Sequence, residues 1–255
     1  MKIGGCKGGE NNPLRYREAG FEFVEEQLCS LAACSEEEFA QKKALYEQGE
    51  LEVLATNLFF PSGISLFRDD IFDYLDEFLP KAAQRAKLLG VGVCVLGSAG
   101  QRTPPAGYDL AKANEHIVKV IRYCCDALAL YGLKLAIEPL KRGETNVINT
   151  VQEGIDAAKS VARENCGFVL DFFHAYMNGE DLSTLAVEDV KKYLFHVHIA
   201  RPNADRGVPR EEDLPVLRKW KKQLDAFGYD KTLSLESGAS VEEVLAARRI
   251  LGLFE

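Results

Sequence analysis

Short apolar runs alternate with longer amphipathic stretches along the whole chain, and this alternation constrains the fold most strongly. The apolar runs predict strands at residues 2–6, 20–25, 51–57, 91–97, 133–138, 167–171, 194–199 and 232–236. The stretches between them predict helices at residues 14–19, 36–48, 71–89, 110–131, 150–162, 182–192, 214–227 and 241–251. Because parallel strands are joined by crossovers that are usually helical, this order favours a parallel sheet.

Eight strand-helix units in 255 residues match the count and size of a closed (β/α)8 barrel, a TIM barrel of the α/β class. The alternative is a doubly wound open sheet. No glycine-rich dinucleotide-binding motif follows the first predicted strand, which weakens that alternative. We see no internal repeat or linker, so residues 1–255 are expected to form a single domain.

Four polar residues close four consecutive apolar runs: Glu138 in "LKLAIE", Asp171 in "GFVLD", His198 in "LFHVH" and Glu236 in "TLSLE". In a barrel, the C-terminal strand ends converge on one mouth. Three carboxylates there repel one another unless a cation compensates their charge. A helix cap or an ion pair would explain any one acid alone, but four such residues in consecutive units favour a metal site. Oxygen ligands with one imidazole suit Mn²⁺, Mg²⁺ or Co²⁺, with Zn²⁺ as an alternative.

Three further residues follow these strand ends and are candidates for substrate binding. His174 lies three residues after Asp171, although a surface-loop histidine is an equal alternative. Glu144 lies six residues after Glu138 and, taken alone, would be a solvated loop acid. Arg206 follows His198 and could hold hydroxyl groups or a phosphate.

Two other segments have less certain roles. His196 alternates with His198, and we expect it to face the other side of its strand as a packed core histidine. Ser98, Gly100 and Arg102 follow the fourth strand, where they form either a flexible surface loop or a seat for a phosphate.

Charge and composition exclude some classes of partner. The net charge of −8 argues against a nucleic-acid partner, although a local arginine could still hold a small anion. The seven cysteines lack the spacing of a disulfide framework and are expected to be reduced. No apolar run reaches membrane-spanning length and the N-terminus lacks a signal core, so we expect a cytoplasmic protein without a membrane partner.

Four segments resemble the xylose isomerase-like barrel superfamily, in its sugar phosphate isomerase/epimerase branch, and within it the D-tagatose and D-psicose 3-epimerases. They are "LAIEPLKRGETNVINTVQEGIDAAKSV", "VLDFFHAYMNGED", "HVHIA" with "DRGVP", and "GYDKTLSLES". The resemblance covers residues 90–250 well and the first third mainly in strand order. Two departures concern the seventh loop, which follows His198. The arginine lies eight rather than six residues after the histidine, and Pro209 is followed by Arg-Glu-Glu instead of Gly-x-Gly.

The resemblance implies that Glu138, Asp171, His198 and Glu236 bind one divalent metal ion. It implies that Glu138 and Glu236 are the acid/base pair, and that Glu144, His174 and Arg206 hold substrate oxygens. It also implies a homo-oligomer, because the family commonly forms dimers or tetramers.

The function expected from these residues is that of a metal-dependent isomerase or epimerase of a sugar or sugar phosphate. It would act by proton transfer through a metal-stabilised enediolate, as a ketose 3-epimerase or an aldose-ketose isomerase. A lyase that resembles the inosose dehydratases is an alternative with the same metal. A non-catalytic sugar-binding barrel is a second alternative, and a phosphodiesterase that resembles endonuclease IV fits poorly because the chain has only four histidines.

Overall fold

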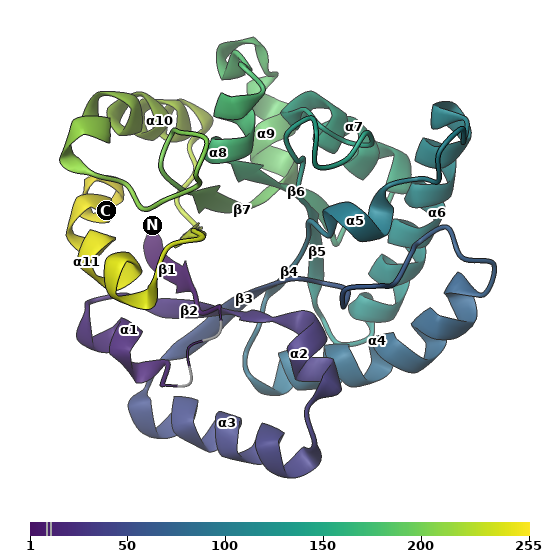
Figure 1. Cartoon of the computed structure of the whole chain (residues 1–255), viewed down its shortest axis with the longest axis horizontal. Helices are drawn as coiled ribbons and strands as arrows, with labels where there is room; N and C mark the ends of the chain where they lie inside the picture. The colour runs from purple at the N-terminus through teal and green to yellow at the C-terminus, as the bar shows by residue number, and fades with distance from the viewer. Residues whose placement is uncertain (9, 11) are drawn as a thin grey trace.

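The protein forms a closed parallel barrel in the computed structural model, which describes residues 1–8, 10 and 12–255 (Figure 1). Neighbouring strands pair in chain order, and the last strand pairs with the first. The strands are β1 (Lys2–Cys6), β2 (Phe23–Gln27), β3 (Glu52–Asn57), β4 (Val93–Leu96), β5 (Lys134–Ile137), β6 (Cys166–Asp171), β7 (Leu194–Ile199) and β8 (Thr232–Leu235). The predicted (β/α)8 barrel is therefore confirmed, and the doubly wound open sheet is wrong.

Helices surround the barrel, as the ring of ribbons in Figure 1 shows. Those expected from the sequence are α1 (Leu14–Glu18), α3 (Glu36–Gly49), α4 (Ile71–Leu88), α6 (Leu110–Ala129), α7 (Val151–Val161), α9 (Val187–Tyr193), α10 (Leu214–Phe227) and α11 (Val241–Leu251). No helix in the part of the chain that the structure describes has the length and apolar character needed to cross a bilayer.

Several short helices were not expected, because they are too short to show an apolar period. They are α2 (Leu28–Ala33), α5 (Ala99–Arg102), α8 (Phe172–Met177) and 3₁₀ turns at Glu211–Asp213 and Gly252–Phe254. A further 3₁₀ turn, Leu182–Thr184, stands where a longer helix was expected. The expected helix at 182–192 is wrong at its start. There the Asp181 carboxylate accepts the Ser183 backbone N–H and closes a 3₁₀ turn, so that α9 begins only at Val187.

Helix starts are set by local side-chain caps. Ser35 and Glu38 form a capping box at the start of α3. The same reciprocal pairing of a hydroxyl with a glutamate begins α7 at Thr150 and α11 at Ser240. These caps satisfy backbone N–H groups that a helix start leaves without partners.

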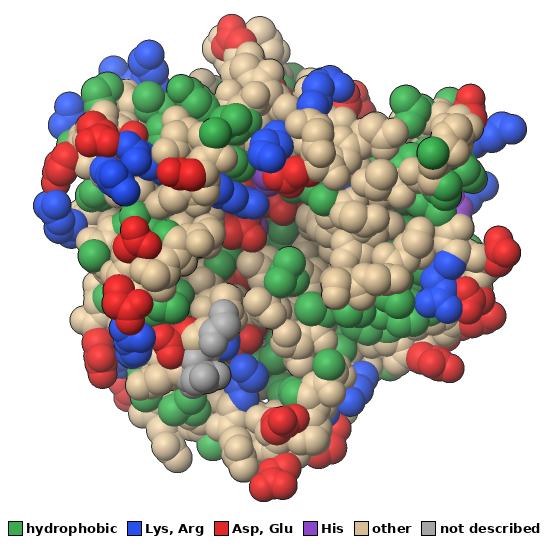
Figure 2. Space-filling model, in the orientation of Figure 1, with side chains coloured by type: hydrophobic (Ala, Val, Ile, Leu, Met, Phe, Trp, Pro, Cys, Tyr) green, Lys and Arg blue, Asp and Glu red, His purple; other side chains and the backbone are tan. Residues whose placement is uncertain are grey.

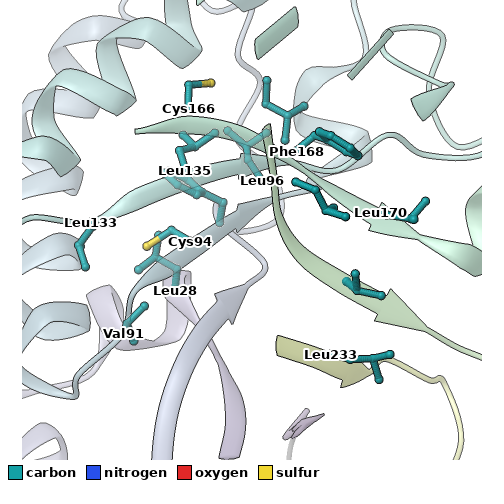
Figure 3. Packing of buried hydrophobic residues seen from close by; sticks show 14 of the residues in the cluster. Leu28, Val91, Cys94, Leu96, Leu133, Leu135, Cys166, Phe168, Leu170 and Leu233 are labelled. Carbon is teal, nitrogen blue, oxygen red and sulfur yellow. The ribbon is translucent and has the colours of Figure 1, made fainter. Parts of the chain in front are cut away.

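The core has two parts because successive strand residues point to opposite sides of the sheet. The larger part contains the side chains between sheet and helices, including Leu96, Leu135 and Leu170 (Figure 3). The smaller part contains the side chains inside the barrel: Val95, Ala136, Val169 and Phe195.

The inner apolar cluster also determines where polar groups meet. Ala136 and Val169 precede Glu138 and Asp171 by two residues, so a period of two places both carboxylates on the same inner side. The two carboxylates lie one layer nearer to the C-terminal strand ends than Ala136 and Val169 do. Active sites of such barrels lie at this end.

Candidate active site

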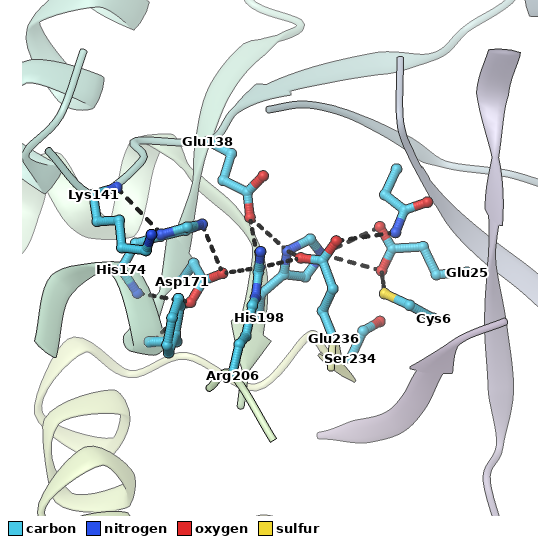
Figure 4. A network of polar contacts seen from close by, with 12 residues as sticks. Cys6, Glu25, Glu138, Lys141, Asp171, His174, His198, Arg206, Ser234 and Glu236 are labelled. Carbon is cyan, nitrogen blue, oxygen red and sulfur yellow. Dashed lines mark hydrogen bonds and ion pairs between the residues drawn. The ribbon is translucent and has the colours of Figure 1, made fainter. Parts of the chain in front are cut away.

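The four residues predicted as metal ligands converge at the C-terminal strand ends (Figure 4). Glu138 and Glu236 directly follow β5 and β8, Asp171 ends β6, and His198 lies within β7. One ligand atom of each lies within 4.8 Å of the others. Barrel closure thus brings together four groups that are up to 98 positions apart, from 138 to 236 in the sequence.

His198 is the centre of this cluster. It is fully buried, and its Nδ1 atom lies 2.8 Å from both Glu138 Oε1 and Glu236 Oε2. Burial lowers the pKa of the imidazole, but the charges of Glu25, Glu236 and Glu138 outweigh burial and raise the pKa well above its usual value. The Nδ1 atom is the imidazole nitrogen that faces Glu138 and Glu236.

Asp171 has both a structural and a site-facing role. Its Oδ1 atom accepts the backbone N–H groups of Phe173 at 2.7 Å and His174 at 3.1 Å, which caps the start of α8. Its Oδ2 atom accepts a hydrogen bond of 2.7 Å from Arg206 Nη2. The cap fixes the carboxylate so that one oxygen faces the site.

Arg206 reaches into the carboxylate cluster from the loop after β7. Its Nη2 atom lies 2.7 Å from Glu236 Oε2 as well as from Asp171, and its guanidinium lies over the Phe173 ring at 5.1 Å. Burial lowers the pKa of the guanidinium, but Glu236 and Asp171 outweigh burial and raise the pKa, so Arg206 is a permanent cation here. The structure therefore brings Arg206 to the site despite the longer gap after His198.

The acid groups of the cluster differ in their affinity for a proton. Burial raises the pKa of Glu138, and the charge of Glu236 raises it further. Burial also acts on Asp171 and Glu236, but the nearby arginine and histidine side chains outweigh it and lower both pKa values. For Asp171 these groups are His174 and Arg206, and for Glu236 they are Arg206 and His198. Environments that separate the pKa values of two carboxylates are what an acid/base pair requires.

His174, one of the predicted substrate-binding residues, lies beside the cluster rather than on the surface. It is buried, and its Nδ1 atom accepts the Lys141 backbone N–H at 3.2 Å. A neutral ring with an acceptor at Nδ1 carries its proton on Nε2. The Nε2 atom lies 3.6 Å from Asp171 Oδ2 and has no hydrogen-bond partner among the described residues.

Glu144 is not brought into contact with the four central residues. It lies in the loop between β5 and α7, where its carboxylate pairs with Lys141 Nζ at 2.7 Å. About a third of its side chain is exposed. The structure therefore places Glu144 at the rim of the mouth.

The expectation for His196 is wrong in one respect. Residues two positions apart on a strand face the same side, so His196 points into the barrel with His198. The two rings lie 5.0 Å apart, and His196 Nε2 lies 3.1 Å from Glu25 Oε2. His196 is fully buried, as a packed core histidine should be.

Two polar residues at this end were not identified from the sequence. Glu25 on β2 is fully buried and faces the Nε2 atoms of His196 and His198. Asn57, the last residue of β3, donates from Nδ2 to Glu236 Oε1 at 3.1 Å. Both positions were usable signals, because the predicted strands at residues 20–25 and 51–57 end at Glu25 and Asn57.

The segment after β4 is not a flexible surface loop around Arg102. This side chain is fully buried, its Nη2 atom donates to the Ile148 carbonyl at 3.2 Å, and burial lowers its pKa to about 10. Leu66 N–H donates to the Gln101 carbonyl at 2.8 Å, and Thr103 Oγ1 donates to Thr145 Oγ1 at 3.1 Å. These bonds join three loops on one side of the mouth.

The donor atoms of the central cluster fit a divalent metal ion. Three carboxylates and one imidazole nitrogen are the ligand types of Mn²⁺, Mg²⁺, Co²⁺ and Zn²⁺ sites. Figure 2 shows acidic side chains in the hollow near the centre of this face, with basic and histidine side chains beside them. A second candidate group, Cys6, Glu25 and His198, lies on the other side of the His198 ring.

Comparison with known proteins supports these observations. Residues 14–252 match the family model described as "Xylose isomerase-like TIM barrel". The chain is 26% identical to the ketose 3-epimerase of Arthrobacter globiformis, with 100% of this chain and 89% of that protein aligned. It is also 26% identical to a probable ketose 3-epimerase of a Synechocystis strain, where the alignment covers 69% of this chain and 61% of that protein.

A crystal structure of a D-psicose 3-epimerase in the presence of D-fructose superimposes with a TM-score of 0.83 at 17% identity, over the full length of both chains. At this identity the likeness supports the fold. The family model covers nearly the whole chain, and the eight-stranded barrel agrees with it. The chain therefore belongs to the xylose isomerase-like TIM barrel family.

Proposed function

We propose that this protein is a metal-dependent epimerase or isomerase of a sugar or sugar phosphate. The observation that carries the proposal is the pair Glu138 and Glu236, whose carboxylates both lie 2.8 Å from the same His198 nitrogen. Two carboxylates at one buried centre can remove a proton from a carbon and return one. Relatives of this chain that are named ketose 3-epimerases support the same reaction class.

Glu138, Asp171, His198 and Glu236 would hold the metal ion. Their donor chemistry and their mutual spacing within 4.8 Å support this assignment. A bound divalent ion would supply positive charge that makes a C–H group next to a substrate carbonyl more acidic. Mn²⁺, Mg²⁺ or Co²⁺ is expected, with Zn²⁺ as the alternative.

Glu138 and Glu236 would be the acid/base pair. One carboxylate removes the proton next to the carbonyl, and the other returns a proton to the enediolate. Return to the opposite face of the same carbon gives an epimer, and return to the neighbouring carbon gives an isomer. The opposite pKa shifts of the two groups support a division into acid and base.

The substrate would be oriented by His174, Arg206 and Glu144. His174 Nε2 carries a proton with no partner among the described residues, so it can donate to a substrate oxygen. Arg206 can donate to hydroxyl or phosphate oxygens while it stays paired with Asp171. Glu144 at the rim can accept from a hydroxyl group of a longer sugar.

The proposal is tested with a panel of ketoses and ketose phosphates, incubated with the protein and Mn²⁺ in D₂O and analysed by NMR. Deuterium at C3 indicates a 3-epimerase, and deuterium at C1 or C2 indicates an aldose-ketose isomerase. Activity should disappear after dialysis against a chelator and return with Mn²⁺.

The same panel, extended by an inosose, separates the alternatives. Loss of water from an inosose would indicate a lyase. Sugar binding without deuterium exchange or product would indicate a non-catalytic barrel. The first result would replace the isomerase or epimerase outcome with an elimination, and the second would contradict the proposed proton transfer.

A further inference from the structure

Glu25 is a fully buried carboxylate to which the proposed reaction assigns no role. Its Oε2 atom lies 3.1 Å from the Nε2 atoms of both His196 and His198, and 3.5 Å from the Cys6 sulfur, which donates to it (Figure 4). A buried carboxylate is costly unless it is fully hydrogen-bonded. Two imidazole groups and one thiol meet this requirement on one side of the barrel interior.

The two nitrogens of His198 face opposite partners. Nδ1 faces the carboxylates of Glu138 and Glu236, and Nε2 faces Glu25 at 3.1 and 3.2 Å. An imidazole that ligates a metal through one nitrogen must carry its proton on the other. Glu25 can accept a hydrogen bond from the Nε2–H group of His198, and this leaves the Nδ1 lone pair directed at the carboxylate cluster.

We propose that Glu25 is a positioning residue, which holds the Nε2 proton of His198 and thereby presents Nδ1 as the metal ligand. The inference rests on the proposed metal site. A carboxylate behind a metal-binding histidine fixes the tautomer and the ring orientation, and it makes the imidazole a stronger ligand.

His196 holds Glu25 in place for this role. Its Nδ1 atom lies 2.7 Å from Thr232 Oγ1, and its Nε2 atom lies 3.1 Å from both Ser234 Oγ and Glu25 Oε2. The ring is therefore fixed at both nitrogens by neighbouring strand residues. In turn it fixes the Glu25 oxygen that faces His198.

The adjacent residue Glu26 offers a matched control. It lies on the same strand and is also buried, but it faces the opposite way, where it pairs with Lys42 Nζ at 2.8 Å and accepts from the Tyr46 hydroxyl. The Glu26→Gln substitution therefore makes the same chemical change one residue away from the site.

The test compares the wild type with Glu25→Ala, Glu25→Gln and Glu26→Gln in the full chain. Thermal melting by circular dichroism checks that each variant folds. Titration calorimetry with Mn²⁺ and with Zn²⁺ gives the dissociation constant and the number of ions bound. We expect Glu25→Ala to weaken metal binding by about 10- to 100-fold, Glu25→Gln to weaken it less, and Glu26→Gln to leave it unchanged.

A second measurement reports the tautomer without reference to activity. In the Zn²⁺-loaded wild type, ¹⁵N NMR should show the His198 proton on Nε2 and the metal on Nδ1. If Glu25→Ala does not fold, the metal affinity of Glu25→Gln and the ¹⁵N spectrum of the wild type still test whether Glu25 positions His198.

Three outcomes would overturn the inference. Unchanged metal affinity in folded Glu25 variants would show that Glu25 does not support the ligand. Two ions per wild-type chain would make Nε2 a ligand in the group of Cys6, Glu25 and His198, so it would carry no proton. A wild type that binds no ion would overturn the metal site itself, which separates failure of the proposed function from failure of this inference.

Discussion

Arg206 and Glu236 form a direct ion pair at the barrel mouth, with Nη2 and Oε2 separated by 2.7 Å. The same Nη2 atom lies 2.7 Å from Asp171 Oδ2. One guanidinium therefore connects two of the candidate metal ligands and neutralises part of their charge.

Replacement of Arg206 tests this connection. A charge-assisted hydrogen bond contributes about 1.5–3 kcal/mol, so we expect Arg206→Gln to reduce kcat/KM by about 10- to 100-fold. Arg206→Lys keeps the charge but loses the planar fork, and should recover only part of the activity. Steady-state kinetics on the accepted sugar measures both, and wild-type kcat/KM in Arg206→Gln would contradict a role in the site.

The two acid/base candidates can be tested with isosteric amides. Glu138→Gln and Glu236→Gln should each lower kcat by about 10²- to 10⁴-fold, because an amide cannot transfer the proton. Their melting temperatures should show that the barrel still folds. Glu188→Gln, at an exposed position on α9, is the control and should keep wild-type kcat. Full activity in both site variants would disprove the assignment.

Gly97 provides a steric test of the position of Glu138. A Cβ atom at Gly97 would overlap the Glu138 Oε2 atom, so Gly97→Ala should displace the carboxylate. A displacement of about 1 Å can cost about 100-fold in rate. The control is Gly100→Ala in the same segment, where a Cβ atom meets nothing within 4 Å. Equal kcat in the two variants would argue against a fixed Glu138 position.

Glu180 lies outside the candidate active site, and we expect it to make the stability of the protein depend on pH. Its Oε2 atom accepts the Val151 N–H at 2.8 Å, and burial raises its pKa. Because the pKa of Glu180 is raised in the folded state, folding favours the neutral carboxyl group. Its stabilising effect is therefore present at low pH and is lost as the pH rises through the folded-state pKa.

Glu180→Gln stays neutral at every pH and keeps an acceptor for Val151. We therefore expect the free energy of unfolding of this variant, relative to wild type, to be larger at pH 7 than at pH 4. Urea unfolding at the two pH values measures the difference. A difference that does not change with pH would show that ionisation of Glu180 does not affect folding.

Much of the site followed from residue types at strand ends. Glu138, Asp171, His198 and Glu236 could be recognised because each polar group ends an apolar run, and parallel strands in a barrel end on one face. His174 could be found by its proximity to Asp171 along the chain. Arg206 was found in the same way from His198, although the sequence did not show that it would contact the ligands themselves.

The specific pairings between these side chains could not be found this way, because they join distant strands. Glu25 lies on β2 and His198 on β7, 173 positions apart, and only barrel closure brings their side chains together. Asn57 reaches Glu236 across the mouth for the same reason. The strand period alone should have placed His196 beside His198, and the structure corrects that expectation.

The amino-acid sequence by itself determined the order of strands and helices, the closed barrel and the strand ends that carry the candidate ligands. These features depend on hydrophobic periodicity and local capping, which act over a few residues. Only the tertiary structure decided which nitrogen of His198 faces the ligands, which carboxylate lies behind it, and that Arg206 connects Asp171 to Glu236. These relationships depend on distances of about 3 Å between groups far apart in the chain, and such distances exist only after the barrel has closed.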